Sequence, residues 1–139
     1  ASLEGLGDAA ETTRVIAITQ LTSTSPEALK TEQLVDVPLV ESVRNYAKLA
    51  QAAGLAGVVC SAHEAADIAS VTGPNFLRVT PGIRPAGSAV GDQSRVATPG
   101  NAASMGSSAI VVGRPITKAD DPVAAYHAIR DDWNAGRKA

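Results

Sequence analysis

The sequence predicts an α/β fold in which parallel β-strands alternate with α-helices. Short runs of Val, Ile and other apolar residues recur along the chain, and stretches with helical periodicity separate them. Glycine, proline or hydroxyl-bearing residues follow each run. Four such βα units make half of a parallel (βα)8 barrel, and 139 residues are few for a complete one, which needs about 200 or more. We therefore predict a half-barrel that forms one domain over residues 1–139.

Four strands are expected where apolar residues run almost without interruption, as in strands that are covered on both faces. They span residues 14–19, 57–60, 76–80 and 109–112. Because parallel strands of a barrel end on one face, the segments that follow them should meet there. These segments are residues 19–23, Ser61, residues 80–84, and Gly113 with Arg114, and they are the most polar and glycine-rich junctions of the chain.

Capping residues and apolar periodicity predict the helices. We expect the end of a helix over residues 2–6, a short helix that begins at Pro26, helices over residues 38–53, 62–71 and 99–105, and a last helix from Asp121 and Pro122 to about Trp133, followed by a frayed tail. Residues 81–98 form a loop that is longer than a plain connector. Loops of that length are usually functional or disordered.

Composition excludes several classes of protein. The net charge is −2 and the 12 basic residues form no cluster, which argues against binding to nucleic acid. No apolar run is long enough for a membrane-spanning helix. Cys60 is the single cysteine, so an internal disulfide is excluded and a reducing, cytoplasmic compartment fits. His63 and His127 have no Cys or acidic partners at ligand spacing, so we predict no metal site and no cofactor.

Gly113 and Arg114, directly after the last strand, are the first candidate site residues. A glycine there lets an anion approach the backbone N–H, and an arginine can form two charge-assisted hydrogen bonds to a phosphate. In the long loop, the amide of Gln93 can donate to a phosphate oxygen, and Arg84 and Arg95 flank it. The alternative interpretation is a turn glycine followed by a surface arginine at Gly113 and Arg114, and a solvated loop residue at Gln93. Arg84 and Arg95 could each either add positive charge at the loop or simply cap it.

Hydroxyl-bearing residues follow the first strand in the segment from Gln20 to Ser25. Hydroxyls and unpaired backbone groups at a strand end can contact the edge of a small base or carbonyl compound. The alternative is an ordinary loop in which Ser25 caps the next helix. Lys118 lies close to Asp120, but we interpret Lys118 as a solvated residue and Asp120 or Asp121 as the cap of the last helix.

Five phrases together resemble orotidine 5′-monophosphate decarboxylase in its bacterial form. They are Ile16-Ala17-Ile18-Thr19-Gln20-Leu21-Thr22-Ser23, Gly57-Val58-Val59-Cys60-Ser61, Val79-Thr80-Pro81-Gly82-Ile83-Arg84, Asp92-Gln93-Ser94-Arg95-Val96-Ala97-Thr98-Pro99 and Ile110-Val111-Val112-Gly113-Arg114-Pro115-Ile116-Thr117. The resemblance runs from about Leu3 to Trp133, and it corresponds to the C-terminal half of that family's (βα)8 barrel. It implies a homodimer, the nucleotides OMP and UMP as ligands, and no cofactor.

The resemblance also implies roles for individual residues. Gln93, Gly113 and Arg114 match the family's phosphate site, Pro81 and Arg84 match the start of its phosphate loop, and Thr22 matches a position that contacts the pyrimidine edge.

The family's catalytic array is a lysine with flanking aspartates, of the form Asp-x-Lys-x-x-x-x-Asp, and it belongs to the first half of the barrel. The lysines of this chain, Lys30, Lys48, Lys118 and Lys138, do not stand in that pattern, so we predict no catalytic residue in this chain. The expected function is therefore the phosphate- and pyrimidine-binding half of the decarboxylase, with catalysis requiring a complementary N-terminal half.

Two alternatives remain at this point. One is a non-catalytic half-barrel that assembles with itself as a scaffold, and the other is a different phosphate-binding barrel enzyme, such as a relative of the sugar-phosphate epimerases. A fragment, a split subunit, an engineered half-barrel or an incomplete sequence would each account for the missing array.

Overall fold

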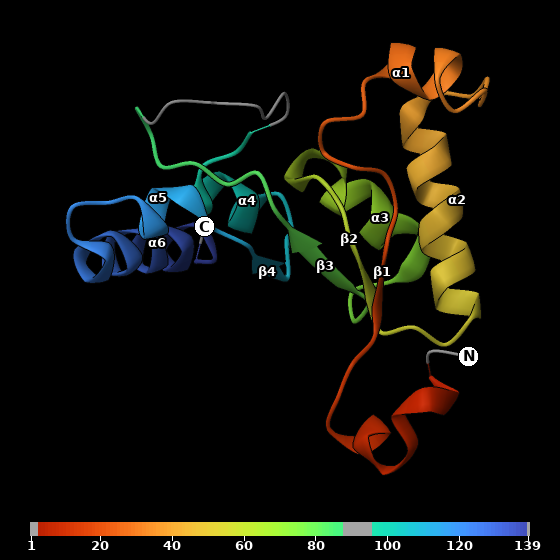
Figure 1. Cartoon of the computed structure of the whole chain (residues 1–139), viewed down its shortest axis with the longest axis horizontal. Helices are drawn as coiled ribbons and strands as arrows, with labels where there is room; N and C mark the ends of the chain where they lie inside the picture. Colours follow the sequence, from red (N-terminus) through yellow and green to blue (C-terminus); the bar gives the residue numbers. More distant parts are fainter. Residues whose placement is uncertain (1–2, 88–95, 139) are drawn as a thin grey trace.

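The computed structural model describes residues 3–87 and 96–138. Its four strands form one parallel sheet in the order β1-β2-β3-β4 (Figure 1). Their bounds are β1 (Ile16–Ile18), β2 (Gly57–Val59), β3 (Leu77–Thr80) and β4 (Ala109–Ile110). Helices separate the strands along the chain, so the predicted alternation is confirmed. The strands are shorter than predicted, most of all at β1, which begins at Ile16 instead of residue 14 and ends at Ile18. At β4, residues 111 and 112 lie outside the strand, although Val111 N still donates to the Thr80 carbonyl at 3.0 Å.

The described residues also form eight helical segments. They are the 3-10 helices η1 (Glu4–Glu11) and η2 (Ala62–Glu64), and the α-helices α1 (Pro26–Thr31), α2 (Leu39–Ala52), α3 (Ala65–Thr72), α4 (Pro99–Ser104), α5 (Arg114–Thr117) and α6 (Pro122–Gly136). The predicted caps are confirmed: the Ser25 hydroxyl accepts a hydrogen bond from Ala28 N at 3.0 Å, and Asp121 Oδ1 accepts from Val123 N and Ala124 N. No helix in residues 3–87 and 96–138 has the length and apolarity that crossing a membrane requires.

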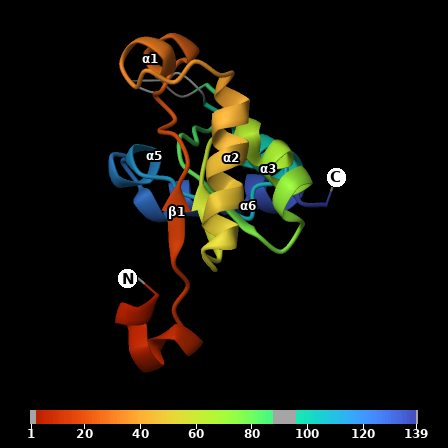
Figure 2. The same ribbon diagram turned by 90° about the vertical axis from the view of Figure 1, so that its right-hand side faces the viewer.

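Three helical predictions need correction. The first helix does not end at Gly7: a 3-10 segment continues to Glu11 across a kink at that glycine, and Figure 2 shows it beyond the amino end of β1. The short helix α5 was not predicted, and Pro115 in its first turn favours it. The last helix extends past Trp133 to Gly136. Gly136 packs closely on Gly100, since a Cβ there would lie 2.1 Å from the Gly100 carbonyl oxygen.

One hydrophobic core lies between the sheet and helices α2 and α3, which Figure 2 shows on the same side of β1. Its buried members are Val43, Ala47, Ala50, Val58, Cys60, Ile68 and Phe76. The predicted burial of Cys60 is confirmed, since its exposed fraction is 0%. A second cluster, formed by Ala62, Ile83, Ala97 and Ala102, packs with Met105, Ile110, Val112 and Trp133. The fold therefore has two cores, joined along the line where β3 meets β4.

The opposite face of the sheet is apolar and largely uncovered in the described residues. The register places Ile18, Val59, Val79 and Ala109 in one row across the four strands, so these side chains point to the same side. Ile18 is 61% exposed, whereas Val58 on the helix-covered side is fully buried. In a closed barrel this face would form the interior.

A buried arginine joins the two cores. Arg78 in β3 is 8% exposed, and its Nε donates to the Gly106 carbonyl at 2.8 Å. Its Nη1 donates to the carbonyls of Phe76 at 2.6 Å and Pro74 at 3.3 Å. These carbonyls lie just beyond the carboxyl ends of α4 and α3, where helix dipoles favour a positive charge. The guanidinium thus supplies hydrogen-bond donors to carbonyl oxygens from both segments.

Serine and threonine hydroxyls form further hydrogen bonds between β3 and the residues before β4. Arg78 N donates to Ser108 Oγ at 3.1 Å, and Ser108 N donates back to the Arg78 carbonyl at 2.8 Å. Thr80 Oγ1, which is fully buried, donates to Ser107 Oγ at 3.0 Å. The register between β3 and the short strand β4 is therefore held by side chains as well as by the sheet.

We expect Arg78→Met to lower the free energy of unfolding by about 3 kcal/mol, because it leaves buried carbonyls without a donor. The matched control is Arg130→Met. Arg130 is exposed and pairs only with its neighbour Asp131 among the contacts found, so its loss should change stability by less than about 0.5 kcal/mol. Urea denaturation at one fixed protein concentration measures both, and equal losses for the two variants would contradict this role of Arg78.

We also expect that the 139-residue chain is not a stable monomer. Strands β1 and β4 each have one unpaired edge, and the apolar row beside Val59 and Val79 is open to water. Pairing with a second copy or with a complementary half would close eight strands. Analytical ultracentrifugation at micromolar concentration measures this. A well-folded monomer as the main species would show that the open face needs no cover.

Candidate functional site

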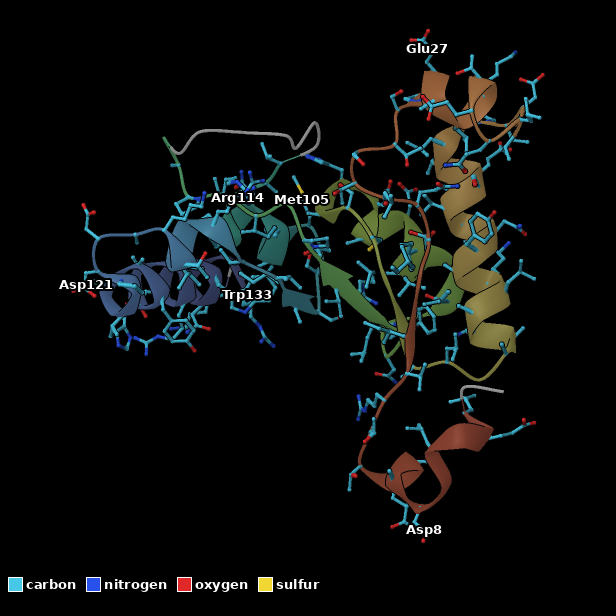
Figure 3. The ribbon with its side chains drawn as sticks, viewed as in Figure 1. Asp8, Glu27, Met105, Arg114, Asp121 and Trp133 are labelled. Carbon is cyan, nitrogen blue, oxygen red and sulfur yellow. The ribbon has the colours of Figure 1, made fainter. Side chains whose placement is uncertain are left out.

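The predicted site segments all lie at the carboxyl end of the sheet. Residues 19–24 follow β1, Ser61 follows β2, residues 81–84 follow β3, and Gly113 and Arg114 follow β4. Figure 3 shows Arg114 at the end of the molecule toward which the strands point, whereas Asp8 of η1 lies at the opposite end. The expected gathering of these junctions on one face is confirmed by the parallel topology.

The two ends of the long loop after β3 lie side by side. Ile83 pairs with Ala97 in a parallel bridge, with Arg84 N donating to the Ala97 carbonyl at 3.0 Å. His63 Nε2 lies 3.2 Å from the Val96 carbonyl oxygen, so a protonated Nε2 donates to it. Ile83 is fully buried in the second core, which fixes both ends of the loop. Asp92, Gln93 and Arg95 lie outside the described residues.

Pro81 and Arg84 belong to the outgoing end of this loop, and both are half-buried. Arg84 Nη1 donates to the carbonyl of Ile83 at 2.8 Å, so part of the guanidinium is directed back to the backbone. A guanidinium has five N–H donors, and this bond uses one of them. Arg84 thus caps the loop, as one of the two sequence-based interpretations expected, and still carries a positive charge beside it.

Gly113 precedes α5, and the space in front of its backbone is open. A Cβ built at Gly113 would meet nothing within 4 Å, and Gly113, as the N-cap residue of α5, has no side chain to cap the helix. Arg114 is the first residue of α5 and is exposed. An anion could therefore reach the backbone beside Gly113 and meet the Arg114 guanidinium at the same time.

The amino end of α4 is the other helix start near the long loop, and it is already filled. Asp132 Oδ2 accepts a hydrogen bond from Gly100 N at 3.0 Å, and Thr98 Oγ1 accepts one from Asn101 N at 3.2 Å. The Asp132 carboxylate would repel a phosphate at that position. This contrast favours Gly113 and Arg114, rather than α4, as the place for an anion.

One cavity joins the segments that carry the two arginines. Its volume is about 460 Å³, and it is lined by Pro85, Ala86, Thr98, Pro99, Pro115, Ala125, Ala128, Ile129 and Asp132. Pro85 follows Arg84 in the chain and Pro115 follows Arg114. The structure therefore brings the loop after β3 and the segment after β4 to a common cavity, which agrees with the prediction that they act together.

The segment after β1 lies farther away in the sheet order, with β2 and β3 between it and β4. Residues 21–24 form a turn in which Thr24 N donates to the Leu21 carbonyl at 2.9 Å. Thr22, predicted to contact the pyrimidine edge, is only 9% exposed, whereas Ser23 at the tip of the turn is exposed. Sequence reasoning did not single out Ser23, because a run of Thr and Ser does not show which hydroxyls point outward.

Gln20 also escaped the sequence analysis as an individual site residue. It is 6% exposed, and its side-chain amide bonds to Gln33 and Ser42. No sequence signal indicates this pairing, since Gln33 lies in an irregular segment after α1.

The four lysines are exposed, and none is in a strand or directly follows one in the chain. Lys30 in α1 pairs with Asp36 at 2.8 Å, Lys48 is in α2, Lys118 ends α5, and Lys138 follows α6. The interpretation of Lys118 as a solvated residue is confirmed. No group of three His, Cys, Asp or Glu side chains that could hold a metal ion occurs within residues 3–87 and 96–138.

Comparison with curated proteins finds close relatives. The chain is 58% identical over 135 residues to an orotidine 5′-phosphate decarboxylase of Streptococcus uberis, covering 97% of this chain and 57% of the relative. It is 58% identical over 133 residues to one of Streptococcus pneumoniae, covering 96% of this chain and 56% of the relative. The chain thus spans about half the length of the curated relatives it matches.

Solved structures show the same fold over the same share of length. An uncharacterized conserved protein from Geobacillus kaustophilus matches with a TM-score of 0.76 and 42% identity, over 96% of this chain and 56% of that one. Orotidine 5′-phosphate decarboxylase from Lactobacillus acidophilus matches with a TM-score of 0.74 and 47% identity, over 88% of this chain and 50% of that one. The parallel four-stranded sheet is therefore part of a TIM-barrel type of fold.

A family model, described as orotidine 5′-phosphate decarboxylase / HUMPS family, matches residues 1–129, which is most of the sequence. Its extent agrees with the range over which the sequence phrases resemble that decarboxylase. The chain therefore belongs to the orotidine 5′-phosphate decarboxylase / HUMPS family.

Proposed function

We propose that this chain is the phosphate- and pyrimidine-binding half of an orotidine 5′-monophosphate decarboxylase, which converts OMP to UMP and CO2 in pyrimidine biosynthesis. The relatives at 58% identity carry that activity in their names. The observation that supports the proposal best is the open backbone at Gly113 beside the exposed Arg114. Pro115, which follows Arg114, also lines a cavity together with Pro85 and Ala86 of the loop after β3. The proposed domain is the C-terminal half of a (βα)8 barrel over residues 1–139.

In this proposal, Gly113 and Arg114 hold the phosphate dianion. The Arg114 guanidinium forms charge-assisted hydrogen bonds to two phosphate oxygens, and the backbone beside Gly113 adds an N–H donor. Arg84 and Pro81 shape the start of the loop that carries Gln93, whose amide donates to the phosphate from the other side. A chain with these groups would bind a nucleotide more tightly than a nucleoside.

The turn after β1 contacts the pyrimidine edge. Thr22 is the residue proposed from the resemblance, and the exposed hydroxyl of Ser23 lies next to it on the same turn. Two adjacent hydroxyls at a strand end can donate to and accept from the carbonyl and N–H groups of a pyrimidine. The base and the phosphate would then be held by opposite edges of the four-stranded sheet, β1 and β4.

Catalysis requires a complementary N-terminal half. Loss of CO2 leaves a carbanion at C6 of the pyrimidine, and without a cofactor an ammonium group must stabilise and then protonate that charge. Lys30 is paired with Asp36, and none of the four lysines is in a strand or directly follows one in the chain, so none is placed for this task. A lysine and aspartates on the complementary half would supply the catalytic groups, in a cytoplasmic enzyme.

The open edges of β1 and β4 also support a second candidate function. The apolar row that includes Ile18 is suited to contact with another copy of the chain. A homo-oligomeric, non-catalytic scaffold that still binds phosphate would use the same surfaces. The two candidates differ in whether turnover appears when the complementary half is added.

We expect Arg114→Ala to weaken binding of UMP about 30- to 150-fold and to leave binding of uridine nearly unchanged, because one charged donor to the phosphate is lost. Titration calorimetry on the assembly of this chain with the complementary part of the Streptococcus uberis relative measures both ligands. Arg130→Ala is the matched control, since Arg130 is an exposed arginine on α6 that pairs with Asp131.

Two results would count against the assignment. Equal losses for UMP and uridine would show that Arg114 supports the structure rather than the phosphate. No loss for either ligand would show that the phosphate lies elsewhere.

A further inference from the structure

The turn after β1 has little support from the sheet. β1 is an edge strand of three residues, and beyond it Thr19 bonds to the Val59 carbonyl through its N–H and its hydroxyl. Residues 21–24 then leave the sheet, and Thr24 N donates to the Leu21 carbonyl at 2.9 Å across the turn. A turn that is to meet a base in one geometry needs further support.

The side chain of Gln20 supplies that support. Its Nε2 donates to Gln33 Oε1 at 3.1 Å, and Gln33 Nε2 donates back to Gln20 Oε1 at 3.1 Å. The same Nε2 donates to Ser42 Oγ at 3.2 Å. Both hydrogens of the Gln20 amide and its oxygen are therefore used. The side chain ties the end of β1 to the segment before α2 and to the first turns of α2.

Burial makes this arrangement specific. Gln20 and Ser42 are each 6% exposed, so an amide that moved would leave polar groups without water or a partner. Gln33 is exposed and closes the pair from the solvent side. Because Gln20 directly precedes Leu21, fixing its side chain also fixes the first residue of the turn.

We propose that Gln20 is a positioning residue for the pyrimidine base, acting with Gln33 and Ser42 to hold the turn of residues 21–24 against the base edge. This inference rests on the proposed function, in which that turn contacts the base. Gln20 itself does not touch the ligand. Its effect should therefore appear for ligands that contain the base and not for ligands that contain only the sugar phosphate.

The test compares UMP with ribose 5-phosphate, which lacks the base. In the assembly with the complementary half, Gln20→Met should weaken UMP binding about 10-fold, the effect of about one lost hydrogen bond, and change ribose 5-phosphate binding less than twofold. Hydrogen exchange at Thr24 N should become faster, since the turn loses its support. Gln51→Met is the control, because the Gln51 amide also donates a side-chain hydrogen bond, to the Thr72 carbonyl at 2.7 Å, near the end of α2 that is far from Ser42.

Gln33→Met provides a milder variant, in case Gln20→Met does not fold. It removes the outer half of the pair and keeps the bond from Gln20 to Ser42, so UMP binding should weaken by about 3-fold with ribose 5-phosphate unaffected. Loss of affinity for both ligands in parallel would overturn the inference and leave Gln20 a purely structural residue. Unchanged UMP binding in both variants would overturn it as well.

The wild-type assembly separates this inference from the proposal beneath it. If it binds UMP no more tightly than ribose 5-phosphate, the proposed base site fails, and the role of Gln20 fails with it. If it prefers UMP and both glutamine variants keep that preference in full, only the inference about Gln20 fails.

Discussion

The guanidinium of Arg78 is the interaction on which the rest of this structure depends. Its N–H groups donate to the carbonyl oxygens of Pro74 and Phe76, after α3, and of Gly106, after α4, and so link the two hydrophobic cores. β4 has just two residues in the sheet, and Ser107 and Ser108 add the bonds that so short a strand lacks.

The second constraint is geometric. Four parallel strands cannot close on themselves, so the face that would be a barrel interior is exposed at Ile18 and Val111, which are 61% and 51% exposed. A four-stranded half also separates the groups that bind the ligand from the groups that catalyse the reaction. The carboxyl ends of these strands carry hydroxyls, an arginine and an open glycine, which suit a phosphate and a base edge, while the lysines lie elsewhere. This arrangement favours a division in which this chain binds the nucleotide and the complementary half supplies the catalytic groups.

Much of the fold could be predicted because parallel strands impose simple rules. Apolar runs located all four strands, and the shared carboxyl face followed from their alternation with helices. The side-chain network could not be predicted. Arg78 stands between apolar residues in a strand pattern. Its hydrogen-bond acceptors are backbone carbonyls, which have no sequence signature. Gln20 and Gln33 pair across an irregular segment, and the exposure of Ser23 beside the buried Thr22 depends on the direction of one turn. Gln93 stays a prediction.

Release of CO2 from OMP is the most direct measurement of the central claim that this chain binds the substrate and a complementary half supplies the reacting groups. The rigorously purified chain should show no turnover. Adding the complementary part of the Streptococcus uberis relative should produce turnover that rises with its concentration and saturates at equal amounts of the two halves. Substantial turnover by the chain alone, or none from a well-formed assembly that binds UMP, would contradict the account.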